Sequence, residues 1–279
     1  MTDAGPVVSL DALVAQVRDG DQMSVATGFH AAYSGVAMDA TRALIRRGVR
    51  KLRLLCVPSS SLQADLLIGA GCLASIEMGA ALLYEYGPAP RFVAAQRAGS
   101  IQVREATCPA IAAGLRAGEA GLPFLPVRGV LGSDVFRVRS NEWKEIDNPF
   151  QPGERIVVIP AIRPDVALFH APLADSHGNV WIGTRGTIRL MAHAAHRVLA
   201  TFDALYPGNL LDDADKAPGT LASTYVTALC HRPGGSWPLH GGPASPEDAD
   251  HMRLYAKLAK TDAGFNEYLE RHMFAQGAR

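Results

Sequence analysis

The 279-residue sequence carries no surplus of charge of either sign and few cysteines. Its 27 Lys and Arg residues balance 27 Asp and Glu residues. No net field would therefore attract the chain to nucleic acid or to an anionic membrane surface, and neither partner is expected. The four cysteines lie far apart without a C-x-x-C pair, which fits neither a disulfide framework nor a zinc site. We expect reduced thiols in a cytoplasmic protein.

Long apolar runs and an export signal are also missing. No stretch approaches the roughly 18 apolar residues of a membrane span, and the N-terminus has an acidic residue and no basic region before an apolar segment. Hydrophobic residues nevertheless make up 48% of the chain and charged residues 19%. This balance excludes intrinsic disorder and supplies ample material for a core.

Strand-like and helix-like segments alternate along the first 120 residues. The apolar runs at 23–26, 52–57, 73–78 and 101–105 are typical of strands, and the segments 35–47, 60–68, 90–98 and 109–116 have helical spacing. Strands separated by helices usually pair in parallel. The sequence therefore predicts an α/β fold, with an open, mainly parallel sheet flanked by helices in a single domain spanning residues 1–279.

The alternation stops between residues 122 and 153, where prolines and glycines are frequent and apolar periods are few. This segment predicts a long ordered excursion over the sheet. Strands are expected again at 155–159, 165–170, 179–182 and 197–202, with a helix at 187–196. The motif Ser245-Pro246-Glu247-Asp248 resembles an N-cap with a first-turn proline, so residues 245–275 are expected to be helical.

Several short motifs are weak indicators of chemistry. The G-x-G-x-x-A pattern at 69–74 follows a predicted helix, whereas a dinucleotide loop follows a strand. His193 and His196 lack an evident third ligand, so no metal site is expected. The residues of Asp175-Ser176-His177 are adjacent in a turn and cannot form a triad, and His240-Gly241-Gly242 has no nucleophile elbow upstream.

The positions that directly follow the predicted strands are better candidates, because open parallel sheets bind ligands at the carboxyl ends of their strands. These positions are 27–30, 58–60, 77–79, 105–106 and 170–172. Gly28 would either expose backbone N–H groups to an oxyanion or only permit a tight turn. Glu105 would be a base, a nucleophile or a helix-dipole partner. Glu77 would be either buried or exposed at a strand end.

Several stretches, in order, resemble the α subunit of the family I coenzyme A transferases, the group of glutaconate and 3-oxoacid CoA-transferases. The matching pieces are GDQMSVATGF (20–29), GLPFLPVR (121–128), LGSD (131–134), NPF (148–150), IPAIRPDVALFH (159–170) and ADSHGNV (174–180). The resemblance covers about residues 9 to 205. It implies an α/β fold, and a β subunit of similar fold with the acyl-CoA site between the two.

The resemblance also implies nucleophilic chemistry, in which a glutamate attacks the acyl-CoA thioester and coenzyme A is a substrate and not a cofactor. That glutamate normally lies in a Ser-Glu-Asn-Gly stretch of the β subunit. The nearest text here, residues 75–79, has one extra residue and no asparagine, so we expect the chain to lack the nucleophile. The substrate-binding residues expected on this basis are Gly28, Phe29, His30, Gly132, Ser133 and His170.

Two alternatives remain open. A subgroup of similar α subunits belongs to steroid-ring degradation, where the paired protein hydrolyses a cyclic β-keto acyl-CoA by carbon–carbon cleavage. A glutamate near the position of Glu105 is the candidate catalytic base there, so Glu105 is the catalytic residue expected for a hydrolase. The second alternative is a noncatalytic protein that binds a CoA ligand.

Overall fold

The computed structural model describes residues 7–28, 32–242 and 245–274. The helices are α1 (Leu10–Val14), α2 (Met38–Arg47), α3 (Leu62–Gly69), η1 (Tyr84–Tyr86), α4 (Pro90–Ala98), α5 (Cys108–Glu119), α6 (Asp134–Arg139), α7 (Gly186–Ala194), η2 (Ala217–Gly219), η3 (Ser223–Tyr225), α8 (Ala249–Leu258), α9 (Asp262–Leu269) and η4 (Glu270–Phe274). The strands are β1 (Gln22–Ala26), β2 (Leu52–Val57), β3 (Ser59–Ser60), β4 (Leu73–Met78), β5 (Ala80–Ala81), β6 (Gln102–Glu105), β7 (Phe124–Val127), β8 (Lys144–Asp147), β9 (Arg155–Pro160), β10 (Val166–Asp175), β11 (Val180–Trp181), β12 (Arg197–Tyr206), β13 (Thr220–Leu221) and β14 (Ala228–His231).

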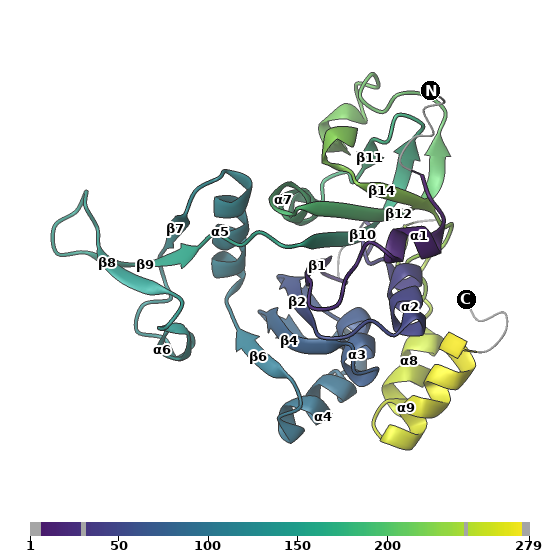
Figure 1. The fold of residues 1–279 in the computed structure, drawn as a ribbon, viewed down its shortest axis with the longest axis horizontal. Helices are drawn as coiled ribbons and strands as arrows, with labels where there is room; N and C mark the ends of the chain where they lie inside the picture. Colours follow the sequence, from purple (N-terminus) through teal and green to yellow (C-terminus); the bar gives the residue numbers. More distant parts are fainter. Residues whose placement is uncertain (1–6, 29–31, 243–244, 275–279) are drawn as a thin grey trace.

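A central sheet of nine strands organises the described part of the chain (Figure 1). Seven strands run parallel in the order β14-β12-β10-β1-β2-β4-β6. The short strands β11 and β13 continue antiparallel from the second half of β10. This arrangement confirms the predicted α/β class with a mainly parallel sheet.

Both faces of this sheet are covered, because successive strand residues contribute to two different cores. On β1, Met23 and Val25 belong to one apolar cluster, and Ala26 belongs to the other. On β10, Leu168 and Phe169 divide in the same way. Alternation with a period of two places adjacent side chains on opposite faces, so the strands read as continuous apolar runs.

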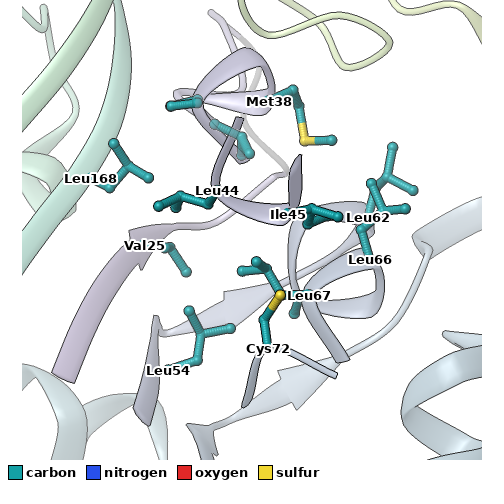
Figure 2. Close-up of a cluster of buried hydrophobic side chains, with 14 of the residues drawn as sticks. Val25, Met38, Leu44, Ile45, Leu54, Leu62, Leu66, Leu67, Cys72 and Leu168 are labelled. Carbon is teal, nitrogen blue, oxygen red and sulfur yellow. The ribbon is translucent and has the colours of Figure 1, made fainter. Parts of the chain in front are cut away.

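Helices α2, α3, α8 and α9 supply the first core, and α5 and α7 supply the second. Figure 2 shows Leu44 and Ile45 of α2 and Leu66 and Leu67 of α3 meeting Val25 and Leu54 of the strands. These side chains are at most 6% exposed. Across the described residues, no helix has both the length and the apolar character needed to cross a membrane.

The segment expected as an excursion over the sheet has regular structure of its own. Strands β7, β9 and β8 form a small antiparallel sheet, which extends away from the central sheet in Figure 1. The expectation of a path over the sheet was therefore wrong. Pro126 obscured the strand signal in β7, yet β7 is an edge strand, where a missing N–H donor is tolerated.

The C-terminal segment is helical as expected, but its first helix begins later. Asp248 caps α8 by accepting a hydrogen bond from the N–H of His251, and Ser245 does not. The carboxylate of Glu247 accepts a hydrogen bond from the hydroxyl of Tyr86, so it is not available for a capping box. A tertiary contact has replaced the local motif that the sequence favoured.

Candidate active site at the carboxyl edge of the sheet

The ends of β1, β2, β4 and β6 lie along one edge of the central sheet because these strands are parallel. Gly28 follows β1 at this edge, and Gly79 follows β4. Phe29 and His30, which were expected to bind substrate, lie outside the described residues. Their role stays a prediction.

Three hydroxyl groups meet where β1 and β2 end. The hydroxyl of Thr27 lies 3.0 Å from that of Ser59 and 3.0 Å from that of Tyr84, and the last two are 3.3 Å apart. These contacts join the end of β1 to the end of β2 and to η1. The edge next to Gly28 is therefore polar, and its hydroxyl groups can donate to or accept from a ligand.

Gly28 lies against Ser61, the residue that precedes α3. A Cβ atom on Gly28 would approach the Ser61 Oγ atom to 2.3 Å, a separation that requires something to shift. Ser61 is 1% exposed, and its Oγ atom has no hydrogen-bond partner among the described residues. No side chain caps α3. Gly28 thus adjoins a helix N-terminus, whose free N–H groups favour negative charge.

Arg185 reaches this edge from the start of α7. It donates from Nη2 to the carbonyl oxygen of Thr27 at 3.2 Å and from Nη1 to that of Tyr33, and it is 2% exposed. Burial lowers the pKa of its guanidinium and raises the pKa of the Tyr33 hydroxyl. The sequence analysis missed Arg185, because nothing near residue 185 marks a contact with a residue 158 positions earlier.

Glu105, the candidate base, ends β6 and is exposed. Its carbonyl oxygen accepts a hydrogen bond from Arg139 Nη1 at 2.9 Å, but its carboxylate forms no hydrogen bond or ion pair with a described residue. Strands β2 and β4 separate β6 from β1. Neighbouring strands are about 4.8 Å apart, so Glu105 lies roughly 14 Å along the edge from Gly28. The two residues do not converge on one atom.

Glu77 is buried, which settles the choice that the sequence left open. Its side chain forms ion pairs with Arg139 at 2.9 Å and with Arg104 at 3.5 Å. Glu142 also contacts both arginines. Glu77 therefore belongs to a paired charge network and is not a free nucleophile, in agreement with the expectation that the chain lacks one.

The residues expected to bind substrate from the excursion lie at the start of α6. Ser133 caps this helix by accepting from the N–H of Phe136, and it donates to the carbonyl of Val130 at 2.6 Å. Gly132 precedes it with a φ of +78°. At the other end of α6, Arg139 contacts the carbonyl of Glu105. The excursion is therefore anchored beside Glu105, whereas substrate contact by Gly132 or Ser133 stays a prediction.

His170 lies inside the fold and not at the surface of the edge. It is fully buried, and its Nδ1 atom is 2.7 Å from the hydroxyl of Thr201. Its Nε2 atom lies 3.1 Å from Asp203 Oδ1. These contacts connect β10 with β12, so the structure gives this side chain a packing role and no access to a ligand.

The weaker motifs have structural roles. The G-x-G-x-x-A stretch lies between the end of α3 and the start of β4, the reverse of a dinucleotide loop. Asp175 accepts hydrogen bonds from the N–H groups of His177 and Asn179, which organise a turn. His193 pairs with Glu119 at 2.7 Å. Within the described ranges, no three His, Cys, Asp or Glu residues are grouped to hold a metal.

Comparisons with known proteins agree with this geometry. The family model described as coenzyme A transferase matches residues 7–224. One of the named subunits of 3-oxoadipate CoA-transferase from Pseudomonas knackmussii is 29% identical over 263 residues, which cover 92% of this chain and 89% of that protein. The IpdA subunit of the cholesterol ring-cleaving hydrolase from Mycobacterium tuberculosis is 29% identical over 278 residues, which cover 95% and 92%.

A solved structure extends the similarity to the whole fold. The crystal structure of glutaconate coenzyme A-transferase from Acidaminococcus fermentans matches with a TM-score of 0.87 at 25% identity. The match covers 97% of this chain and 89% of the solved chain. The relatives thus share the fold over nearly their entire length, although their names include both a transferase and a hydrolase.

Proposed function

The chain belongs to the coenzyme A transferase family of enzymes, and from that premise we propose that it is the α subunit of a heteromeric CoA-transferase. The enzyme moves coenzyme A between an acyl-CoA and a carboxylic acid. Coenzyme A is a substrate in this proposal, and no resident metal or prosthetic group takes part. We also propose a cytoplasmic location, which suits the free cysteines of the described chain.

One observation carries the division of labour between the subunits. Gly28 lies at the carboxyl edge beside the start of α3, where an oxyanion would be stabilised. Neither glutamate that ends a strand there is placed to attack a thioester at Gly28. Glu77 is paired with Arg139, and Glu105 is three strands away. The partner β subunit therefore supplies the nucleophilic carboxylate.

The reaction follows from these parts. A glutamate carboxylate of the partner attacks the thioester carbonyl, and the Gly28 N–H stabilises the resulting oxyanion. Breaking the carbon–sulfur bond releases the CoA thiolate and leaves a mixed anhydride. The thiolate then attacks the glutamyl carbonyl, which releases the first acid and forms a glutamyl-CoA thioester. The acceptor carboxylate reverses both steps and leaves as the new acyl-CoA.

An apolar hollow on the excursion supports the presence of a partner chain. It has a volume of about 480 Å³ and lies on the small sheet, where Phe124, Ile146, Phe150 and Ile156 contribute to its lining. Phe150 is 94% exposed. Surfaces of this kind commonly mark protein interfaces. The relatives, which are themselves named as subunits of larger enzymes, support a protein that works with a second chain.

The test uses the chain purified together with the protein that associates with it in its native host. An acyl-CoA is added with and without a panel of acceptor acids, and products are followed by mass spectrometry. Exchange that depends on an acceptor is the expected result. Lack of exchange with every acid in a broad panel would contradict the proposal.

A second candidate, a CoA-dependent hydrolase, is favoured by the unpaired carboxylate of Glu105. An exposed carboxylate at a ligand-binding edge is available as a general base. This reading predicts consumption of acyl-CoA without an acceptor and a roughly 100-fold or greater loss in Glu105→Gln. Unchanged turnover in that variant would remove Glu105 from the mechanism. Tight CoA binding without turnover would instead favour a noncatalytic role.

A further inference from the structure

We infer that Arg185 is a positioning residue, which orients the Thr27–Gly28 peptide so that the Gly28 N–H can stabilise the oxyanion. The inference rests on the proposed function, because it concerns the donor that the proposed reaction uses. Arg185 does not touch the reacting atoms itself. It acts through the peptide group that carries the donor.

The first argument is the unusual environment of Arg185. Arg42 and Arg139 are also almost fully buried, and each pairs with a carboxylate, that of Asp39 or of Glu77. Arg185, by contrast, has no carboxylate partner among the described residues. Its guanidinium bonds two backbone carbonyls and lies over the Tyr33 ring at 5.2 Å. Burying a cation without a counter-charge is costly, so a role beyond packing is expected.

The second argument is the identity of the two carbonyl groups. They belong to Thr27 and Tyr33, on either side of the segment that follows β1. A single planar fork therefore fixes two backbone groups that are six positions apart in the chain. Arginine suits this task because its N–H donors have a fixed geometry.

The third argument is the geometry of the peptide group itself. The Thr27–Gly28 bond is not among the cis bonds of the described chain. In a trans peptide, the carbonyl and the next N–H point in opposite directions. When Arg185 binds the carbonyl of Thr27, it therefore turns the N–H of Gly28 away from the guanidinium. No described group accepts a hydrogen bond from this N–H.

The space for the guanidinium is also specific. A Cβ atom on Gly35 would lie 3.2 Å from Arg185 Nη2 and 2.8 Å from Ile188 Cδ1. Gly35 has a φ of +71°, which side chains rarely adopt. Its carbonyl accepts from the N–H of His170 in β10. The fold thus leaves room for Arg185 next to the strand whose end it holds.

The charge adds to the orienting effect. A cation bound to the carbonyl of a peptide polarises that peptide, which makes its N–H a better donor to a negative oxygen. Pre-oriented donors of this kind act mainly in the transition state, so their loss lowers kcat more than it changes KM. The inference therefore predicts a split between the two constants that loss of packing alone would not produce.

The experiment compares Arg185→Met with Arg189→Met in the complex with the partner chain. Arg189 lies on the same helix and donates only to the carbonyl of Pro218 at an exposed site. We expect Arg185→Met to lower kcat about 10- to 100-fold with KM within twofold, and Arg189→Met to match the wild type. A crystal structure of the Arg185→Met complex is expected to show the Thr27–Gly28 peptide rotated.

Either of two results overturns the inference: a kcat of Arg185→Met within twofold of wild type, or an unchanged Thr27–Gly28 peptide in its crystal structure. If Arg185→Met does not fold, Arg185→Lys decides. A kcat at least fivefold lower with KM within twofold supports the inference, and a kcat within twofold of wild type overturns it. If the wild-type complex shows no exchange with any acid, the proposed function fails, and the peptide orientation alone then judges Arg185.

Discussion

Glu77 and Arg139 form an ion pair with 2.9 Å between Oε1 and Nη2, and both side chains are more than nine-tenths buried. The pair joins strand β4 to helix α6 of the excursion. Arg139 also donates to the carbonyl of Glu105. One arginine thus keeps Glu77 from acting as a nucleophile and fixes the backbone of the candidate base.

Replacing Arg139 with methionine leaves Glu77 buried beside Arg104 alone. Removing one member of a buried ion pair is strongly destabilising, so Arg139→Met is expected to lower the free energy of unfolding by about 3 kcal/mol. The matched control is Arg137→Met, which breaks the exposed pair with Asp134 and should cost about 0.5 kcal/mol or less. Urea denaturation measures both. Equal losses in the two variants would show that burial of the pair adds nothing.

The stability of the C-terminal helices is expected to fall in mild acid because of His251. Burial, together with the nearby His272 and Arg42, lowers the pKa of His251 to about 4, whereas Asp248 opposes this shift. The Nε2 atom of His251 is 2.7 Å from the hydroxyl of Tyr268. Below the ordinary pKa of 6.5 the unfolded chain binds a proton that the folded chain refuses, so stability declines from pH 6.5 toward 4.

The variant His251→Gln tests this assignment, because glutamine keeps a polar partner for Tyr268 and does not titrate. Its free energy of unfolding is expected to decline less than that of the wild type between pH 6.5 and 4, by an amount on the order of 2 kcal/mol. Parallel curves for the two proteins would assign the acid sensitivity elsewhere. The buried carboxyl of Asp65, whose pKa burial raises, works in the opposite direction and is common to both proteins.

Gly28→Ala is expected to lower kcat by about 100-fold or more, because the new methyl group meets the hydroxyl of Ser61 and shifts the donor peptide. Gly208→Ala provides the control. Gly208 is exposed, and a methyl group there would make only ordinary contact with Tyr206. Steady-state kinetics of the complex measures both variants. A Gly28→Ala enzyme with wild-type kcat would exclude this glycine from oxyanion stabilisation.

Phe150→Asp is expected to weaken association with the partner chain by at least about tenfold, because exposed aromatic residues dominate the energy of many interfaces. Phe274→Asp is the control: it is 56% exposed and lies in η4 at the C-terminal side, away from the β8–β9 hairpin (Figure 1). Co-purification and titration binding measure the effect. Equal affinities for the two variants would place the partner on another surface.

Elements with complete local signals were predictable from the sequence. Strand β4 and helix α4 have the expected bounds, 73–78 and 90–98. Pro90 at the start of α4 and the left-handed Gly99 at its end provide both boundaries in the chain itself. The small sheet was not predictable in the same way, because prolines in β7 resemble a loop until its partner β9 is known.

The candidate site was predictable only in its position. The rule that ligands bind beyond the carboxyl ends of parallel strands located Gly28 and Glu105. It could not indicate that Glu77 pairs with Arg139, 62 positions later, or that Arg185 bonds Thr27. Such contacts depend on side chains that meet only after the sheet has formed. The same limit applies to His170, whose burial follows from its neighbour β12.

The central claim is that this chain stabilises the oxyanion and its partner supplies the nucleophile. The most direct test is to incubate the complex with acyl-CoA in the absence of an acceptor acid and to map covalent adducts by mass spectrometry. The account predicts a glutamyl-CoA thioester on the partner chain and none on this chain. An adduct on Glu77 or Glu105, or consumption of acyl-CoA without any adduct, would contradict it.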